Sequence, residues 1–312
     1  MLPYLLRRKE AGIFLALLAL MILITVFKPE FISGENRKIL SRQIAYTAIV
    51  ALGVFFAILT SGIDLSVGSI LGLSGVVCGL AMAIWHMDPL VAVILGLLTG
   101  VVAGAINGAI ISYIGVTSFI VTLAMLGMAR GAVWVLTHGE PVLNIPESFI
   151  TLGQSSLCGV PMAVIVMLAA ALVAHVVLTY TVFGRRVYAI GGNEEATRLS
   201  GINTRRVKFL AYVLSALFSS LTGILFVARF RSAQANAGAG MELDAIAAAV
   251  IGGASLMGGE GTVIGVLIGA AVMGVVRSGL IFMNVSSYWQ DLVIGGVIVL
   301  AAIFDVVRSR RR

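Results

Sequence analysis

The chain has little charge for its size. Only 11% of its 312 residues are Asp, Glu, Lys or Arg, against roughly 25% in an ordinary soluble domain, whereas 60% are apolar. Together with a mean hydropathy of +1.08, this composition excludes a water-soluble fold. The net charge of +7 comes from basic residues in short segments between apolar runs. It therefore predicts an orientation in a lipid membrane rather than binding to nucleic acid.

Motifs of catalysis and cofactor binding are also absent from the sequence. No lysine follows a glycine, so the phosphate-binding loop GxxxxGK[ST] does not occur. The three histidines are scattered, without HExxH or CxxC, and nothing resembles a nucleophile elbow. Two cysteines, Cys78 and Cys158, are too few for a disulfide framework. We expect no catalytic residues, no metal site and no cofactor.

Apolar runs long enough to cross a bilayer recur along the chain. A helix needs about 20 apolar residues to span the hydrocarbon core. The runs lie at 11–28, 43–61, 65–84, 89–111, 116–137, 161–180, 207–228, 242–257, 261–281 and 288–307. They predict an all-α integral membrane protein with about ten transmembrane helices. The first run follows Arg7, Arg8 and Lys9 but lacks the cleavage site of a signal peptide, so we interpret it as a membrane helix.

The positions of the basic residues predict that both termini are cytoplasmic. With the N-terminus inside, the predicted inner segments hold most of the Lys and Arg residues, including Arg308, Arg310, Arg311 and Arg312, and the outer loop 138–160 has none. Segment 28–42 disagrees, because it falls outside yet is basic. We expect an interfacial helix there.

An internal repeat predicts two related five-helix units, 1–160 and 161–312. Two offsets align short segments of the halves: 96–100 with 265–269, 116–119 with 285–288, and, after an insertion or deletion, Asp64 with Asp244 and Gly72 with Gly252. Because an odd number of crossings separates the copies, the second copy is inverted relative to the first. Inverted repeats are typical of transporters that work by alternating access.

Polar residues interrupt the apolar pattern at the start of the third predicted helix. Asp64 could cap this helix by accepting hydrogen bonds from its free N–H groups. Alternatively, polar groups at an interrupted helix line a water-filled path, since ionisable groups in membrane segments face protein or water. On that second interpretation, the candidate residues of a substrate path are Asp64, Ser66, Ser69, Asn107, Thr117 and Ser118.

Glycines recur at every fourth position of the fourth predicted helix, at Gly96, Gly100, Gly104 and Gly108. Missing side chains on one face let another backbone approach closely, so this pattern predicts tight helix packing. Asn107 lies beside the glycines and could form a structural hydrogen bond with another helix.

The longest predicted cytoplasmic loop, 183–207, is more organised than a loop that only sets topology. Residues 194–199 can form one or two helical turns between glycines, with Asn193 as the N-cap and Glu194 paired with Arg198 at i,i+4.

Three sequence blocks resemble a known family: GIDLSVGS at 62–69, GRRVYAIGGNEEATRLSGI at 184–202 and AVIGGASLMGGEGT at 249–262. They are similar to the membrane permeases of binding-protein-dependent ABC importers of the ribose, xylose and arabinose type, which include autoinducer-2 permeases. The resemblance implies a subunit of the bacterial inner membrane that forms a homodimer or heterodimer. It also implies separate ABC ATPase subunits inside and a periplasmic sugar-binding protein outside.

By the same resemblance, the helix in loop 183–207 looks like a coupling helix that docks on the ATPase. The residues concerned are Asn193, Glu194, Glu195, Arg198, Leu199 and Ser200.

Four arginines lie near predicted outer helix ends: Arg130, Arg229, Arg231 and Arg277. Long basic side chains there can extend to the membrane interface. Alternatively, Arg229 and Arg231 pair with acidic residues of a binding protein, which would mainly affect the association rate.

The predicted function is therefore that of a permease subunit for a small sugar, surrounded by membrane lipid and powered by a separate ATPase. An ion- or proton-coupled secondary transporter is the alternative, but it would need charged groups deep in the spans, which are nearly free of them. A channel or a structural scaffold would not need the organised loop 183–207.

Overall fold

The computed structural model describes residues 9–286, 288–290, 292–296 and 299. Several residues of the topology prediction lie outside the described part of the chain: Arg7, Arg8, Arg308, Arg310, Arg311 and Arg312. Most of the predicted helix 288–307 lies outside it as well.

Long apolar helices dominate the described chain and confirm the predicted helical class. The helices that are long and apolar enough to cross a membrane are α2 (Lys9–Phe27), α3 (Gly34–Leu59), α5 (Pro89–Ala109) with its π-helical continuation η2 (Ile110–Ile114), α6 (Ser118–Thr137), α8 (Met162–Tyr180), α11 (Thr204–Phe230) and α13 (Val263–Phe282). Two apolar helices are shorter: α4 (Val67–Ala83) and α12 (Met241–Ile251). At 17 and 11 residues, these two are shorter than the roughly 20 residues that usually span the hydrocarbon core.

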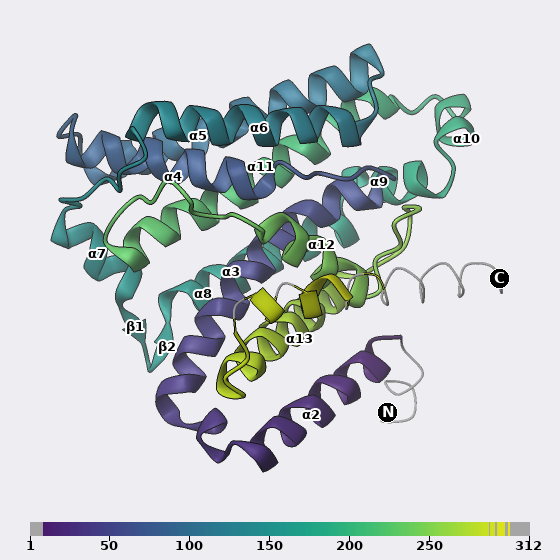
Figure 1. Cartoon of the computed structure of the whole chain (residues 1–312). Helices are drawn as coiled ribbons and strands as arrows, with labels where there is room; N and C mark the ends of the chain where they lie inside the picture. The colour runs from purple at the N-terminus through teal and green to yellow at the C-terminus, as the bar shows by residue number, and fades with distance from the viewer. Residues whose placement is uncertain (1–8, 287, 291, 297–298, 300–312) are drawn as a thin grey trace.

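The connecting segments contain small elements that gather at opposite ends of the helical body (Figure 1). At one end lie α7 (Glu147–Gln154) and the hairpin of β1 (Ser156–Leu157) and β2 (Val160–Pro161); we call it the α7 end. At the other lie α9 (Val182–Gly192) and α10 (Glu194–Leu199); we call it the α10 end. A short 3-10 turn, η1 (Pro29–Ile32), joins α2 to α3.

Helices α3 and α11 form the centre of the molecule. Nearly all of α3 after Ala45 is buried. The glycine face of α5 packs closely, as the sequence predicted, and its partner is α11, which the sequence did not identify. A Cβ at Gly104 would lie 2.6 Å from the Ala216 Cβ and 2.7 Å from the Tyr212 carbonyl oxygen. Only glycine permits the two backbones to come this close.

Helix α2 has a different environment, because most of its side chains are exposed and it packs mainly against α13. Ile24 of α2 is buried against Gly279 of α13. The exposed apolar side chains of α2 would face lipid in a membrane.

The short helices α4 and α12 begin side by side after irregular segments that enter from opposite ends. Segment 60–66 leads from the α10 end into α4. Loop 231–240 leaves α11 at the α7 end and runs back along α4, with Ala233 against Gly79 and Ala237 against Gly72. Gly238 then contacts Gly68, so the first turns of α4 and α12 are neighbours.

Two predicted boundaries are wrong. Helix α3 begins at Gly34, where the Ser33 hydroxyl accepts a hydrogen bond from the Asn36 N–H, so residues 34–42 are its first turns rather than a separate interfacial helix. The predicted helix 242–257 ends at Ile251. Gly252 and Gly253 follow it, and Gly253 has φ +91, a left-handed conformation typical of helix ends.

Candidate functional site

The break between α3 and α4 carries a buried hydrogen-bond network around Asp64. The Asp64 carboxylate is completely buried. Its Oδ1 accepts hydrogen bonds from the Ser66 N–H at 3.0 Å and the Ser66 hydroxyl at 2.5 Å, and its Oδ2 accepts one from the Ser215 hydroxyl of α11 at 2.8 Å. None of these partners is cationic, so hydrogen bonds alone compensate the burial of this acid.

Two further candidate residues belong to this network. Asn107 of α5 donates from Nδ2 to the Ser66 hydroxyl at 2.9 Å, and the Ser69 hydroxyl donates to the Ser66 carbonyl at 2.8 Å. The interhelical bond expected for Asn107 is thus present. Its Oδ1 is buried and has no hydrogen-bond partner within the described residues. Such an orphan acceptor costs free energy in a fixed structure.

The start of α6 lies against the same break. Of the two candidate residues there, Ser118 contacts the break and Thr117 does not. The Ser118 hydroxyl accepts a hydrogen bond from the Ile63 N–H at 3.3 Å, and the Thr122 hydroxyl donates to the Ile63 carbonyl at 3.3 Å. Thr117 is exposed and makes no side-chain cap bond. The structure therefore brings together Asp64, Ser66, Ser69, Asn107 and Ser118, and leaves Thr117 at the surface.

Asp64 does not act as the helix cap that the sequence left open as one interpretation. Helix α4 begins at Val67 with Ser66 as N-cap, and the carboxylate accepts the N–H of Ser66 itself rather than one from the first turn of the helix. The arrangement is a turn that holds segment 60–66 in its irregular conformation.

Sequence reasoning missed Ser215, the partner of Asp64 on α11. Ser215, Ser219 and Thr222 are spaced i, i+4 and i+7, which places three small polar residues on one face of a membrane helix, and all three are buried. A search for polar residues at helical spacing would have marked this face.

Glu242 and Arg130 were not predicted to lie near the break either. The Glu242 Oε2 rests against Gly68, where an added Cβ would overlap it, and this oxygen has no hydrogen-bond partner within the described residues. The Arg130 guanidinium of α6 donates to the carbonyls of Ala235 and Ala237 at 3.1 and 2.9 Å. Arg130 thus holds loop 231–240 near the start of α4 instead of extending to a membrane interface.

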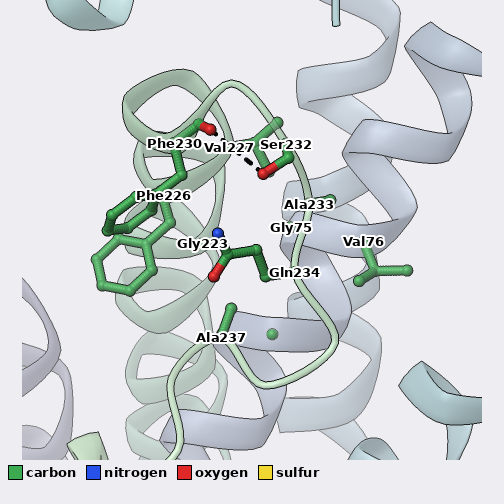
Figure 2. Close-up of a pocket in the computed structure, with 11 residues that line it drawn as sticks. Gly75, Val76, Gly223, Phe226, Val227, Phe230, Ser232, Ala233, Gln234 and Ala237 are labelled. Carbon is green, nitrogen blue, oxygen red and sulfur yellow. Dashed lines mark hydrogen bonds between the residues drawn. The ribbon is translucent and has the colours of Figure 1, made fainter. Parts of the chain in front are cut away.

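A small hollow lies between α4, α11 and loop 231–240 (Figure 2). Glycines of both helices, Phe226, Phe230 and the Gln234 side chain line it, and the Ser232 hydroxyl donates to the Phe230 carbonyl at 3.2 Å beside it. None of the six predicted path residues is among its lining residues. The buried network at Asp64 and this hollow are separate features.

The predicted helix in loop 183–207 is present as α10, and Asn193 caps it by accepting the Ala196 N–H at 2.9 Å. The predicted Glu194–Arg198 pair is wrong. Arg198 pairs with Glu195 at 2.5 Å, one position closer, because Glu194 turns to Lys208 of α11 at 2.9 Å. The hydrogen bond from Arg198 lowers the pKa of Glu195 below its usual value. Leu199 is 76% exposed, so α10 presents an apolar side chain between charged ones.

Two of the other three arginines that were predicted at outer helix ends pair with acidic side chains. Arg231 pairs with Glu147 of α7 at 2.6 Å, with both side chains more than half exposed. Arg277 pairs with Asp244 of α12 at 2.9 Å, and this aspartate side chain is only 11% exposed. The third, Arg229, accepts a hydrogen bond at its backbone carbonyl from the Gln154 side-chain amide at 3.0 Å.

Comparisons with known proteins agree over nearly the whole chain. Residues 37–302 match the family described as branched-chain amino acid transport system / permease component. The chain is 44% identical over 295 residues to the ribose import permease of Escherichia coli (strain K12), covering 93% of this chain and 92% of the relative. It is 42% identical over 303 residues to the ribose import permease of Bacillus subtilis (strain 168), covering 96% and 94%.

A third relative transports a different sugar by name. The D-allose transport system permease of Escherichia coli (strain K12) is 36% identical over 301 residues, which cover 96% of this chain and 92% of the relative. The comparison with solved structures found no match.

Proposed function

The chain belongs to the family described as branched-chain amino acid transport system / permease component, and from this membership and its similarity to ribose and allose permeases we propose that it is the permease subunit of an ABC importer for a small sugar. The observation that carries this proposal is identity of 36–44% over more than nine tenths of each chain, to relatives named for sugars. The protein is a transport subunit and not an enzyme, because ATP hydrolysis resides on a partner chain.

The substrate path passes the break between α3 and α4. Asp64, Ser66, Ser69, Asn107 and Ser118 supply hydroxyl, amide and carboxylate groups that can replace the water around a sugar. All but Ser118 are at most 1% exposed here, so this conformation corresponds to a closed path. Exposed Thr117 lies at the mouth of the path on the α10 side.

The subunit has ten membrane crossings in two inverted five-helix units, with both termini cytoplasmic. The arrangement of α4 and α12 supports this, since each is a short helix preceded by an irregular segment, and the two segments enter from opposite ends. Discontinuous helices that meet near the middle of a membrane are a common feature of inverted-repeat transporters. The α10 end then faces the cytoplasm and the α7 end the periplasm.

A second permease subunit, identical or closely related, completes the path. Helix α6 is the candidate contact, because a Cβ at Gly127 or Gly131 would meet nothing within 4 Å and both lie on its exposed face. Two glycines spaced by four residues let membrane helices pack closely. Thr117 begins the same helix, so pairing through α6 would place it between the two subunits.

Two soluble partners act at opposite ends. The ATPase subunit docks on α10, with Leu199 as the apolar contact and Asn193, Glu194, Glu195, Arg198 and Ser200 around it. A periplasmic sugar-binding protein docks at the α7 end near Arg229 and Arg231. Because Arg231 already pairs with Glu147, a binding protein would compete for it, and the contact would affect mainly the association rate.

The experiment is reconstitution in vesicles with the ATPase and the binding protein. Labelled ribose and allose should accumulate only when ATP, the ATPase and the binding protein are all present. Accumulation by this subunit alone, driven by a proton or sodium gradient, would contradict the proposal and indicate a secondary transporter. ATP-driven uptake of leucine in place of either sugar would retain the importer but reject the substrate class.

A further inference from the structure

Three backbone segments that are far apart in the sequence meet at the α10 end. They are the turn after α3 (59–62), the last turn of α9 at Gly191, and the loop between α12 and α13 (257–261). The Gly259 N–H donates to the Leu59 carbonyl at 3.1 Å, and the Ser61 hydroxyl donates to the Met257 carbonyl at 2.7 Å. The first and third segments are thus hydrogen-bonded to each other, and the last turn of α9 packs against both; we call the three segments together the glycine junction.

Gly191 lies at the centre of the glycine junction. A Cβ at this position would overlap both the Leu59 carbonyl oxygen and the Gly259 nitrogen, and would lie 2.8 Å from the Gly258 carbonyl carbon. Backbone atoms cannot move aside as a flexible side chain does. Gly192, the next residue of the same helix turn, would meet nothing within 4 Å. Of these two glycines, only Gly191 therefore lacks room for a side chain.

A second contact joins α9 to the same loop. The Tyr188 hydroxyl, one turn before Gly191, donates to the Gly261 carbonyl at 3.0 Å. Helix α9 consequently touches loop 257–261 on both sides of Gly259, and neither contact involves a long charged side chain that could stretch. Such a packed arrangement transmits displacement instead of absorbing it.

Each member of the glycine junction leads directly to a different part of the proposed transport machinery. Gly191 is two residues before Asn193, the cap of α10. Segment 59–62 continues into Asp64 and its buried network. Loop 257–261 continues to Thr262, which caps α13 by accepting the Gly265 N–H at 3.0 Å. Both irregular connections, before α4 and after α12, are therefore held against the end of α9.

We propose that Gly191 is a positioning residue that passes displacement of α10 to segment 59–62 and loop 257–261, so that the three segments move as one body in the transport cycle. This inference rests on the proposed function, because α10 must be the element that the ATPase displaces. In this proposal α9 moves as a rigid helix, and the glycine junction attaches it to segment 59–62 and loop 257–261.

The test compares Gly191→Ala with its matched control Gly192→Ala in the assembled complex. Both substitutions add one methyl group to the same helix turn, so any effect of helix propensity is shared. Gly191→Ala should leave ATPase co-purification and basal ATP hydrolysis intact. It should lower the stimulation of hydrolysis by loaded binding protein, and the solute moved per ATP, by roughly 5- to 150-fold, the usual range of coupling between sites. Gly192→Ala should match the unaltered protein in all four measurements.

Equal effects of the two substitutions, or normal uptake by the Gly191→Ala complex, would overturn the proposal. If the unaltered complex shows no ATP-driven uptake, the proposed function fails instead, so the two failures are distinguishable.

A cross-link keeps the proposal falsifiable if Gly191→Ala does not assemble. Ser61→Cys and Met257→Cys place two exposed thiols in adjacent segments, in a chain whose Cys78 and Cys158 have been replaced. Segments that move as one body tolerate a disulfide between them, so oxidised complexes should transport as well as reduced ones. Loss of uptake on oxidation, restored by a reductant, would show relative motion and overturn the proposal.

Discussion

The Asp64 carboxylate accepts a hydrogen bond from the Ser215 hydroxyl, and this 2.8 Å contact joins residues 151 positions apart. It fixes the break between α3 and α4 against the middle of α11. Since α11 also receives the glycine face of α5, the same helix supports both the packing of the bundle and the buried polar network. A displacement of α11 would therefore open the network at Asp64.

Replacement of Asp64 by asparagine should retain assembly but reduce uptake. The amide would turn an NH₂ group toward hydroxyl or N–H donors that now face an oxygen. A mismatched buried donor costs about 1–3 kcal/mol, which should lower the unfolding midpoint in detergent and the rate of ATP-driven uptake. The control is Asp88→Asn, because Asp88 is an exposed N-cap that asparagine replaces well. Full uptake by an equally expressed Asp64→Asn protein would remove this residue from the mechanism.

Alanine at Gly104 should destabilise the bundle, whereas alanine at Gly12 should not. The added methyl at Gly104 would press on Ala216 and on the Tyr212 carbonyl, whereas Gly12 of α2 has nothing within 4 Å. Overpacking of a helix interface costs about 1–3 kcal/mol, and an unhindered glycine-to-alanine change in a helix gains up to about 1 kcal/mol. Thermal unfolding of the two purified variants measures the difference. Equal midpoints would show that α5 and α11 can separate without cost.

Charge reversal at Glu194 should uncouple ATP hydrolysis from transport. Glu194→Lys would place a second cation beside Lys208, 2.9 Å from the present carboxylate oxygen, and so loosen α10 from α11. We expect weaker co-purification of the ATPase and loss of its stimulation by loaded binding protein; Glu195→Arg should act in the same direction. Glu35→Lys, an equal charge change at the exposed start of α3 near the opposite end, is the control. Normal stimulation in the Glu194→Lys complex would reject α10 as the docking element.

The Asp244–Arg277 pair should show measurable coupling between α12 and α13. The aspartate side chain is 11% exposed and the arginine 33%, so solvent screens the pair only in part. A double-mutant cycle with Asp244→Asn and Arg277→Gln should give a coupling energy of about 0.5–3 kcal/mol in thermal unfolding. Strictly additive effects would mean that the pair contributes nothing beyond its separate contacts.

Local chemistry made several features predictable. The helix N-cap at Asn193 depends on residues within one turn, and the glycine face of α5 on a repeat at every fourth residue from Gly96 to Gly108; both features were expected correctly. The partner of Glu194 was not, because Lys208 reaches it from the next helix and competes with Arg198 on the same one. The contacts of Arg130 with Ala235 and Ala237 could not be predicted either, because every residue has a backbone carbonyl and the sequence does not show which one a distant side chain will contact.

The sequence by itself determined that this chain lies in a membrane, because burial of long apolar runs away from water does not depend on which helices pack together. Its similarity to sugar permeases placed it in a family. Only the tertiary structure decided which residues meet. Ser215 became the partner of Asp64, Glu242 came to rest on Gly68, and Gly191 came between two loops, because helix packing selects contacts by shape, and shape is a property of the folded chain.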